Sequence, residues 1–277
     1  LLPLRPPHRI GGEGFGGGAS LTLAKSPSPV EVYNDRDEGL VGFFRVLRDP
    51  KAFKRFYRLV QLTPYSRTEW RECRATWEAQ ADPVVRSIRW FVVARQSFGG
   101  LFAGSWGFGV AISSRGMASE VSKWLSCIEY LPRVVERLQR VQIECQDWRD
   151  CLTTYDTEDT LFYCDPPYVP ITRSSGTYRH EMTEADHREM VARLLTLHGQ
   201  VILSGYPSPV YQPLVDAGWE ERRWDTVCYA VGRTRPSLCQ GEGSALQHAP
   251  RTEVVWMKRR QRQRTLWEQV EGDAFFS

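Results

Sequence analysis

The segment "TLFYCDPPYVP" (160–170) joins a short apolar run to an acid, two prolines and a tyrosine. The apolar run is typical of a buried strand, and in open α/β sheets the carboxyl ends of strands carry the groups that bind ligands. Asp165 falls at that point. Pro166 has a fixed φ and the prolines lack a backbone N–H, so the Pro166 carbonyl beside Asp165 can only accept hydrogen bonds. The pattern therefore indicates a rigid pair of acceptors.

Such a pair suits a substrate that offers two N–H donors, and the exocyclic amino group of a nucleobase is one. Tyr168 adds a flat surface on which a base could stack, a contact worth about 1–3 kcal/mol in proteins that bind single strands. The alternative interpretation is a strand that ends in a Pro-Pro turn with Asp165 facing solvent. The combination of residues favours an amine on an aromatic ring as the substrate.

Composition sets wide limits on the rest of the protein. The chain has 277 residues, 42% of them hydrophobic, which is enough for one large domain or one domain with an insert. A formal net charge of +3 permits a polyanionic partner without requiring one. The seven cysteines show neither a Cys-x-x-Cys pair nor the spacing of zinc ligands. We therefore expect reduced thiols, no metal and a cytoplasmic protein. No stretch approaches the roughly 18–20 apolar residues of a membrane span.

The first notable segment near the N-terminus is rich in glycine. The stretch "GGEGFGGG" (11–18) has six glycines in eight residues, a composition that alone is typical of a flexible linker. An alternating strand pattern follows in "PVEVYND" (29–35), and then a helical pattern in "DEGLVGFFRVL" (37–47). The spacing of apolar residues predicts helices over 51 to about 95. An aromatic and glycine-rich loop or hairpin is expected at 96–109.

Beyond a further helix from 119, the segment "RVQIECQDW" (140–148) is predicted to be a strand. From 160 the pattern becomes strand, loop, helix, strand, with Thr183 and Asp186 as a capping box at the start of the helix. A short helix and two strands complete the chain. The sequence thus predicts two α/β parts around a helical and loop insert.

Four motifs in this order resemble those of the Dam-like DNA adenine (N6) methyltransferases, particularly their phage and prophage relatives. They are a Phe-x-Gly motif in "EGFGGGAS", an acidic strand end in "EVYND", the aromatic insert "RQSFGGLFAGSWGFG", and Asp-Pro-Pro-Tyr in "FYCDPPY". The resemblance covers nearly the whole chain. It implies a Rossmann-like AdoMet-dependent methyltransferase fold of the α/β class with an inserted, mainly helical target-recognition module.

The same resemblance implies a division of the chain into four segments. Residues 1–50 would form the first part of the methyltransferase domain with the cofactor motif, and 51–138 the target-recognition insert. Residues 139–258 would form the second part with the catalytic motif, followed by a basic C-terminal tail at 259–277.

The resemblance also implies S-adenosylmethionine as cofactor and no metal. Phe15 and Gly17 would approach the methionine moiety, and Asp35 would bind the ribose hydroxyls. Asp147 and Trp148 would contact the cofactor adenine, with a core aromatic as the alternative for Trp148. Asp165 would border the cofactor as well as the substrate.

For catalysis, the resemblance implies a target base flipped out of duplex DNA, at a cost of a few kcal/mol. Asp165 and the Pro166 carbonyl would accept its amino hydrogens while Tyr168 stacks on the ring. The expected DNA contacts are Arg95, Phe98 and Trp106 in the insert, and Arg173 and Arg179 in the loop after the catalytic motif. Packing of the insert is the alternative role for Phe98 and Trp106.

Two departures from the family pattern leave alternatives open. The chain shows no upstream Gly-Gly-Lys motif, and the strand before Phe15 offers Ile10 as its one apolar residue, so a weakened cofactor half is expected. The alternatives are a truncated or decayed methylase that binds DNA without turnover, and a cytosine-N4 methyltransferase. In each case double-stranded DNA is the expected partner. A cognate restriction enzyme is a further candidate partner, and a bacterial or phage-encoded origin is expected.

Overall fold

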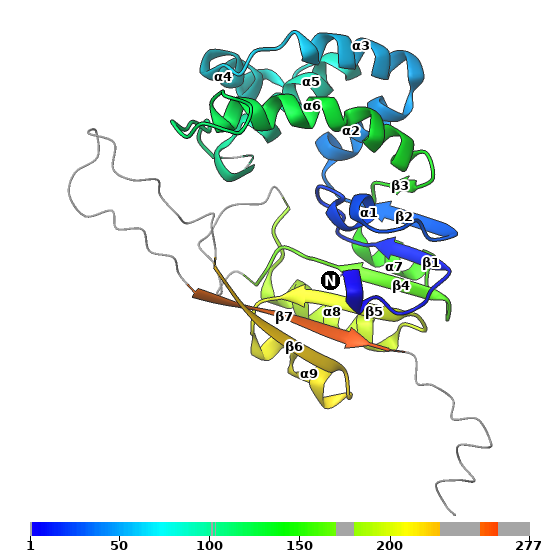
Figure 1. The fold of residues 1–277 in the computed structure, drawn as a ribbon. Coiled ribbons are helices and arrows are strands. Elements are labelled where there is room, and N and C mark those ends of the chain that lie inside the picture. The colour runs from blue at the N-terminus through cyan, green and yellow to red at the C-terminus, as the bar shows by residue number, and fades with distance from the viewer. Residues whose placement is uncertain (1, 101, 103, 170–179, 228–249, 260–277) are drawn as a thin grey trace, which may run out of the picture.

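The computed structural model describes residues 2–100, 102, 104–169, 180–227 and 250–259 (Figure 1). Its strands form one sheet in the order β3-β2-β1-β4-β5-β7-β6. These strands are β1 (Ile10–Glu13), β2 (Val30–Asn34), β3 (Gln142–Glu144), β4 (Thr160–Cys164), β5 (Gln200–Gly205), β6 (Glu220–Val227) and β7 (Pro250–Lys258). The first five are parallel, while β7 is antiparallel to both β5 and β6. The predicted α/β class with a Rossmann-like sheet is confirmed.

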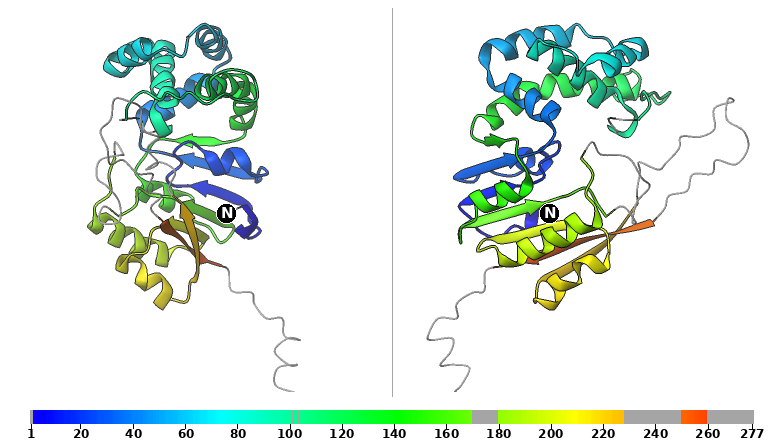
Figure 2. Two further views of the ribbon diagram at one scale, coloured as in Figure 1. Left: turned by 60° about the vertical axis from the view of Figure 1, so that its left-hand side comes forward. Right: turned by 180° about the vertical axis from the view of Figure 1, so that it is seen from behind.

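The helices divide into two groups around this sheet. They are α1 (Ser20–Ala24), α2 (Glu38–Arg48), α3 (Pro50–Gln61), α4 (Arg67–Thr76), α5 (Pro83–Gln96), α6 (Ser119–Leu138), α7 (Trp148–Thr154), α8 (Glu184–Thr196) and α9 (Gln212–Asp216). Figures 1 and 2 show α2 to α6 gathered beyond the β3 edge of the sheet, whereas α7 and α8 lie against the strands. We call α2 to α6 the helical layer.

Chain order determines where a ligand can bind. The chain runs outward from β1 to β2 and β3 and then returns to place β4 on the other side of β1. The connections that leave β1 and β4 therefore diverge to opposite sides, which opens a crevice at the carboxyl ends of these two strands. The sheet topology alone points to this crevice as the binding site.

The first strand forms despite its poor sequence. All four residues of β1 are buried, and the strand pairs with β2 and β4 at the centre of the sheet. A Cβ at Gly12 would lie 2.9 Å from the Phe162 ring, so the ring fills the space that a side chain would need. The glycines that seemed to weaken this strand let β1 pack closely against its neighbours.

Aromatic packing and N-terminal caps hold the helical layer together. The Phe43 ring lies 5.2–5.6 Å, between centroids, from the rings of Phe44, Phe56, Trp90 and Phe91. Side chains cap α2, α3, α4 and α5 by accepting backbone N–H bonds from the first turns; these caps are Asp37, Asp49, Ser66 and Asp82. The predicted helices over 51 to 95 are therefore confirmed.

The strand predicted over 140–148 is shorter than expected. Only β3, a three-residue strand, forms there, and α7 begins at Trp148. The reason is Asp147, whose side chain accepts the Arg149 backbone N–H and starts a helix. The predicted capping box of α8 is present, with Thr183 and Asp186 bonded reciprocally.

A buried ion cluster joins the helical layer to the sheet. Glu31 of β2 is 2% exposed and accepts two hydrogen bonds from Arg137 of α6, at 2.5 and 2.7 Å. Lys25, just after α1, also bonds Glu31 and Ser28. Three elements from different layers thus share one buried carboxylate.

Within the described residues, no helix is long and apolar enough to cross a bilayer, and no cluster of His, Cys, Asp and Glu could hold a metal ion. The five cysteines in the described part of the chain are free thiols.

Candidate active site

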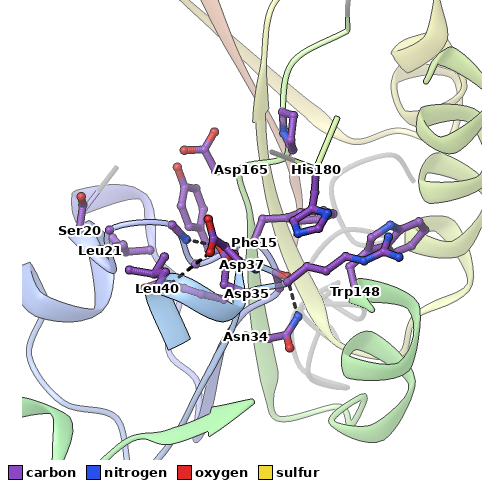
Figure 3. Close-up of a pocket in the computed structure, with 18 of the residues that line it drawn as sticks. Phe15, Ser20, Leu21, Asn34, Asp35, Asp37, Leu40, Trp148, Asp165 and His180 are labelled. Atoms are coloured by element: carbon purple, nitrogen blue, oxygen red, sulfur yellow. Dashed lines mark hydrogen bonds between the residues drawn. The ribbon is translucent and has the colours of Figure 1, made fainter. Parts of the chain in front are cut away.

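A cavity of about 660 Å³ opens at the carboxyl ends of β1, β2 and β4 (Figure 3). It occupies the crevice to which the sheet topology points. Five residues singled out in the sequence line it: Phe15, Gly17, Asp35, Trp148 and Asp165. Phe15 and Asp165 are 150 positions apart in the sequence, so the fold brings distant motifs together at one cavity.

The loop after β1 requires glycine at two positions for different reasons. A Cβ at Gly16 would lie 2.1 Å from the Tyr33 ring, so no side chain fits. Gly17 has a φ of +47°, where side chains are strained. The Tyr33 hydroxyl donates to the Gly17 carbonyl at 2.6 Å, and the Gly16 N–H donates to the Asn34 carbonyl at 2.8 Å. The loop is therefore a fixed cradle and not a flexible linker.

Asp35 is fixed at the end of β2 by backbone donors. Its Oδ2 accepts the Gly17 N–H at 2.8 Å and its Oδ1 accepts the Asp37 N–H at 2.8 Å. Partial burial raises the pKa of Asp35, while these two hydrogen bonds act in the opposite direction. Each carboxylate oxygen keeps further lone-pair capacity, so Asp35 can still accept hydrogen bonds from a ligand in the cavity.

Asn34 ties the loops of three strands together. Its Nδ2 donates to the carbonyls of Gly14, at 3.0 Å, and Gln146, at 3.2 Å, and its Oδ1 accepts the Gln146 N–H at 3.0 Å. Asn34 also lines the cavity but is absent from the predicted site. Its position directly before Asp35 in "EVYND" is the only sequence signal that could have indicated it.

Trp148 and Asp147 have different places in the structure. Trp148 lines the cavity and is also core, because it is only 6% exposed and its ring centroid lies 6.0 Å from that of Phe15. The Arg149 guanidinium covers the indole at 4.4 Å. Asp147 caps α7 and forms ion pairs with Arg36 and Arg149. Asp147 is not among the residues that line the cavity.

Asp165 follows β4 and is exposed to the cavity. Its Oδ1 accepts a hydrogen bond from the Ser204 hydroxyl at 2.8 Å. The surrounding protein raises the pKa of Asp165 by removing water, and hydrogen bonds from Ser204, Tyr163 and Tyr168 partly offset that effect.

A second carboxyl group lies nearby at the end of β1. Glu13 is 4% exposed, lines the cavity and accepts a hydrogen bond from the Thr22 hydroxyl. Burial raises the pKa of Glu13 to about 7, and the charge of Asp165 contributes in the same direction. Glu13 is absent from the site predicted from the sequence, although an acid inside a run of glycines is a usable signal.

The two other predicted catalytic residues, Pro166 and Tyr168, follow Asp165 in the chain. Pro166 is buried, and the next residue, Pro167, lines the cavity. The Tyr168 ring makes an edge contact with Tyr206, with centroids 4.5 Å apart and planes at 75°. Tyr206 comes from the segment after β5, and nothing in the sequence analysis pointed to it.

The three predicted DNA contacts in the described part of the chain are not among the residues that line the cavity. Arg95 is exposed in the last turn of α5, and Phe98 is partly buried. Trp106 forms a bridge with Ser97 and is partly covered by the Arg67 guanidinium at 4.8 Å. Arg173 and Arg179 lie outside the described residues.

The most exposed large hydrophobic side chains in this region belong to three residues close together in the sequence, and the first of them, Phe108, lies in the aromatic insert. Phe108 is 58% exposed, Val110 97% and Ile112 80%. Phe108 stacks on Trp106, with centroids 6.2 Å apart and planes at 10°. We call these three residues the apolar strip.

Comparison with known protein families identifies the family of this chain. A family model described as D12 class N6 adenine-specific DNA methyltransferase matches residues 12–206, more than half of the chain. The chain belongs to this family. The matched region of the methyltransferase runs from β1 through the helical layer to the end of β5, so it contains the whole cavity rim formed by β1, β2 and β4. No curated protein matches the sequence.

Membership makes DNA the substrate of the methyltransferase and adenine its target base. The seven-stranded, mostly parallel sheet agrees with a Rossmann-like methyltransferase fold. The Asp-Pro-Pro-Tyr segment at 165–168 falls inside the matched region, at the edge of the cavity.

Proposed function

We propose that this methyltransferase transfers a methyl group from S-adenosylmethionine to the exocyclic amino group of an adenine flipped out of duplex DNA. One observation carries the proposal: Asp165, the glycine loop and Asp35 border a single cavity at the switch point of the sheet. An acceptor for an amino group thus lies beside a cradle for a cofactor.

The residues of the cavity fit S-adenosylmethionine. The Gly16–Gly17 backbone approaches Tyr33 so closely that no side chain occupies the cradle, and Asp35 offers acceptor capacity to a ribose diol. Phe15 and Trp148 supply an aromatic wall. The cavity volume lies within the roughly 300–1,000 Å³ of small-molecule sites. When bound, S-adenosylmethionine supplies an electrophilic methyl group.

Asp147 supports this site in a different way from the contact expected for it. Its carboxylate caps α7 and pairs with Arg36 and Arg149, so it fixes the start of the helix that carries Trp148. A direct contact from Asp147 to the cofactor adenine would compete with these bonds. We assign the aromatic contact to Trp148 and a supporting role to Asp147.

The protein's part in the reaction is to orient the target amine. Asp165 and the Pro166 carbonyl accept the two amino hydrogens, and this turns the nitrogen lone pair away from the ring and towards the methyl donor. Tyr168, held at its edge by Tyr206, stacks on the flipped base. The base is positioned and its acceptors are in place before the reaction begins, and this lowers the barrier to methyl transfer.

The helical layer would bind DNA. It corresponds to the proposed target-recognition insert at 51–138, together with α2 from the proposed first segment. Arg95 is exposed and suited to contact phosphate or guanine. Phe108 is more exposed than Phe98 or Trp106 and is therefore the better candidate to fill the gap left by the flipped base.

The test is product analysis. The protein is incubated with S-adenosylmethionine and duplex DNA of mixed sequence, and methylated nucleosides are quantified by mass spectrometry. The expected product is N6-methyladenine, absent with Asp165→Ala. N4-methylcytosine would instead assign the acceptor pair to cytosine. DNA binding without any product would support the alternative of a methylase without turnover.

A further inference from the structure

The catalytic aspartate is bonded from the neighbouring strand. β4 and β5 are parallel, with Cys164 opposite Leu203, so Asp165 and Ser204 are the next pair in register. The Ser204 Oγ donates to Asp165 Oδ1 at 2.8 Å, and the Tyr163 Oη lies 3.2 Å from the same Ser204 oxygen. Ser204 is 7% exposed, so water does not replace these bonds easily.

The direction of each hydrogen bond follows from the number of protons. A serine hydroxyl has one proton, and its acceptors here are the Asp165 carboxylate at 2.8 Å and the Cys164 carbonyl at 3.4 Å. The shorter bond, to the charged acceptor, is the stronger. The single proton of the Tyr163 hydroxyl can then be donated to Ser204 or directly to Asp165, so Tyr163, Ser204 and Asp165 form one hydrogen-bonded cluster.

We propose that Ser204 is the positioning residue for Asp165: it holds Oδ1 so that Oδ2 accepts the hydrogen of the target amine, while Tyr163 fixes the Ser204 hydroxyl. This inference rests on the proposed function. It assigns to β5 a role in the reaction even though Ser204 itself does not touch the base.

The need for such a residue follows from the freedom of the aspartate side chain. Rotation about the last torsion of an aspartate is broad, so an isolated carboxylate would present either oxygen at many angles. The amine lone pair is directed only if its acceptor is fixed, and small displacements at a reacting centre cost a large part of the rate. The bond from the buried Ser204 restricts this freedom, together with the hydrogen bonds from Tyr163 and Tyr168.

The same bond affects protonation. The groups that face Asp165 are Glu13 on β1, Tyr163 on β4, Ser204 on β5 and Tyr168 in the following loop. Donors to the carboxylate stabilise its ionised form, which opposes the loss of water around it. Loss of Ser204 should therefore make Asp165 protonate at a higher pH.

The experiment measures steady-state adenine methylation by the full-length protein over a range of pH. For Ser204→Ala we expect kcat to fall about tenfold or more, because a hydrogen bond to a charged group is lost. KM for DNA should stay within about twofold, since Ser204 makes no ground-state contact with the substrate. The acidic limb of the kcat profile should move to higher pH. Ser204→Thr keeps the hydroxyl and should recover most of the activity.

Two further variants complete the test. Tyr163→Phe should give a smaller loss of the same kind, because it releases the Ser204 hydroxyl without removing it. Ser208→Ala is the matched control: Ser208 caps the turn after β5 by accepting the Val210 N–H, and its loss should leave kcat unchanged. If Ser204→Ala does not fold, Ser204→Cys decides the question, because a thiol is a poor donor.

The outcomes separate this inference from the proposed function. A Ser204→Ala enzyme with wild-type kcat and an unchanged acidic limb would overturn the positioning role, even where Asp165→Ala is inactive. An equal loss in Ser204→Ala and Ser204→Thr would also overturn it, because the hydroxyl would then not be the active feature. A wild-type protein that methylates no adenine would overturn both proposals.

Discussion

Asp165 and Glu13 are carboxyl groups at the ends of adjacent strands, and their surroundings differ. Asp165 is open to the cavity and accepts a hydrogen bond from Ser204, whereas Glu13 is 4% exposed and accepts one from Thr22. Burial raises the pKa of Glu13 to about 7, so a large fraction of Glu13 is neutral near neutral pH. Burial raises the pKa of Asp165 as well, so both carboxyl groups favour the neutral form more than an ordinary carboxyl group does.

The buried Glu13 predicts a pH dependence of stability. Its pKa in the folded protein, about 7, lies above the ordinary value of 4.5, so the folded state binds the proton more tightly than the unfolded state. The free energy of unfolding should therefore fall as pH rises from about 4.5 to 7, by up to about 3 kcal/mol from this group.

Urea denaturation of the wild type and Glu13→Gln at several pH values measures this contribution. The difference between the two proteins should change over that pH window, because glutamine does not titrate. A constant difference would show that Glu13 keeps an ordinary pKa in the folded protein.

At the scale of single elements, the loop after β1 shapes the site through its backbone. Its glycines are required by the close approach of Tyr33 and by the positive φ at Gly17. The hydrogen bond from Gly17 to Asp35 then links this loop to the end of β2. A composition typical of a linker therefore forms a tightly constrained loop of the cavity.

Gly16→Ala should destabilise the protein and weaken S-adenosylmethionine binding, because the added Cβ would lie 2.1 Å from the Tyr33 ring. Overpacking of this kind costs about 1–3 kcal/mol. Thermal unfolding and isothermal titration with S-adenosylmethionine measure the two effects. Gly42→Ala in α2, where a Cβ meets nothing within 4 Å, is the control and should be neutral or slightly stabilising. Equal thermal stability and equal affinity for S-adenosylmethionine in the two variants would show that the loop has room for a side chain at Gly16.

The sequence predicted those parts of the site that depend on local pattern. An apolar run before Asp165, the acid after "EVYN" and the capping box at Thr183 are short-range signals, and the structure has a strand end or helix start at each. The strand predicted over 140–148 was too long and α7 was not predicted, because the capping role of Asp147 competes with the strand pattern before it.

The parts that escaped prediction depend on contacts across the sheet. Ser204 meets Asp165 only because β5 pairs with β4 in one register, and Tyr206 meets Tyr168 for the same reason. Glu13 was missed because β1 itself was thought weak. Its support comes from Phe162 on another strand, which a reading of the β1 sequence does not reveal.

At the scale of the whole molecule, the buried cluster of Glu31, Lys25 and Arg137 determines how the helical layer is attached to the sheet. Glu31 and Arg137 are 106 positions apart in the chain and connect β2 with the end of α6. The cavity lies at the carboxyl ends of the strands, and the proposed DNA contacts lie in the helical layer. This attachment would therefore fix the position of the cavity relative to the bound DNA.

Glu31→Gln leaves two cations without their carboxylate and should lower the free energy of unfolding by about 3–5 kcal/mol, as expected when one partner of a buried ion pair is removed. The control is Glu129→Gln, which breaks the exposed pair with Arg115 and should change the free energy of unfolding far less, because solvent screens that pair. Urea denaturation compares them. Similar small losses would mean that the buried cluster does not hold the two parts together.

The apolar strip predicts how the whole molecule meets DNA. Phe108→Ala should weaken binding to duplex DNA by about 1–3 kcal/mol, the contribution of a ring that stacks on bases. It should also reduce extrusion of the target base, which the fluorescence of 2-aminopurine at the target position measures. Val215→Ala, in α9 outside the helical layer and 37% exposed, is the control and should leave DNA binding unchanged. Equal effects of the two variants would remove the strip from the DNA interface.

The most direct test of the central claim is the rate of methyl transfer in a single turnover, measured for the wild type and Asp165→Ala with S-adenosylmethionine and DNA both saturating. We expect the rate for Asp165→Ala to be lower by a factor of about 10²–10³ or more, as when one preorganised polar group is removed from an active site. The dissociation constants of both ligands should change little. A transfer rate close to that of the wild type would contradict the account, because the acceptor pair at the end of β4 would then not orient the amine.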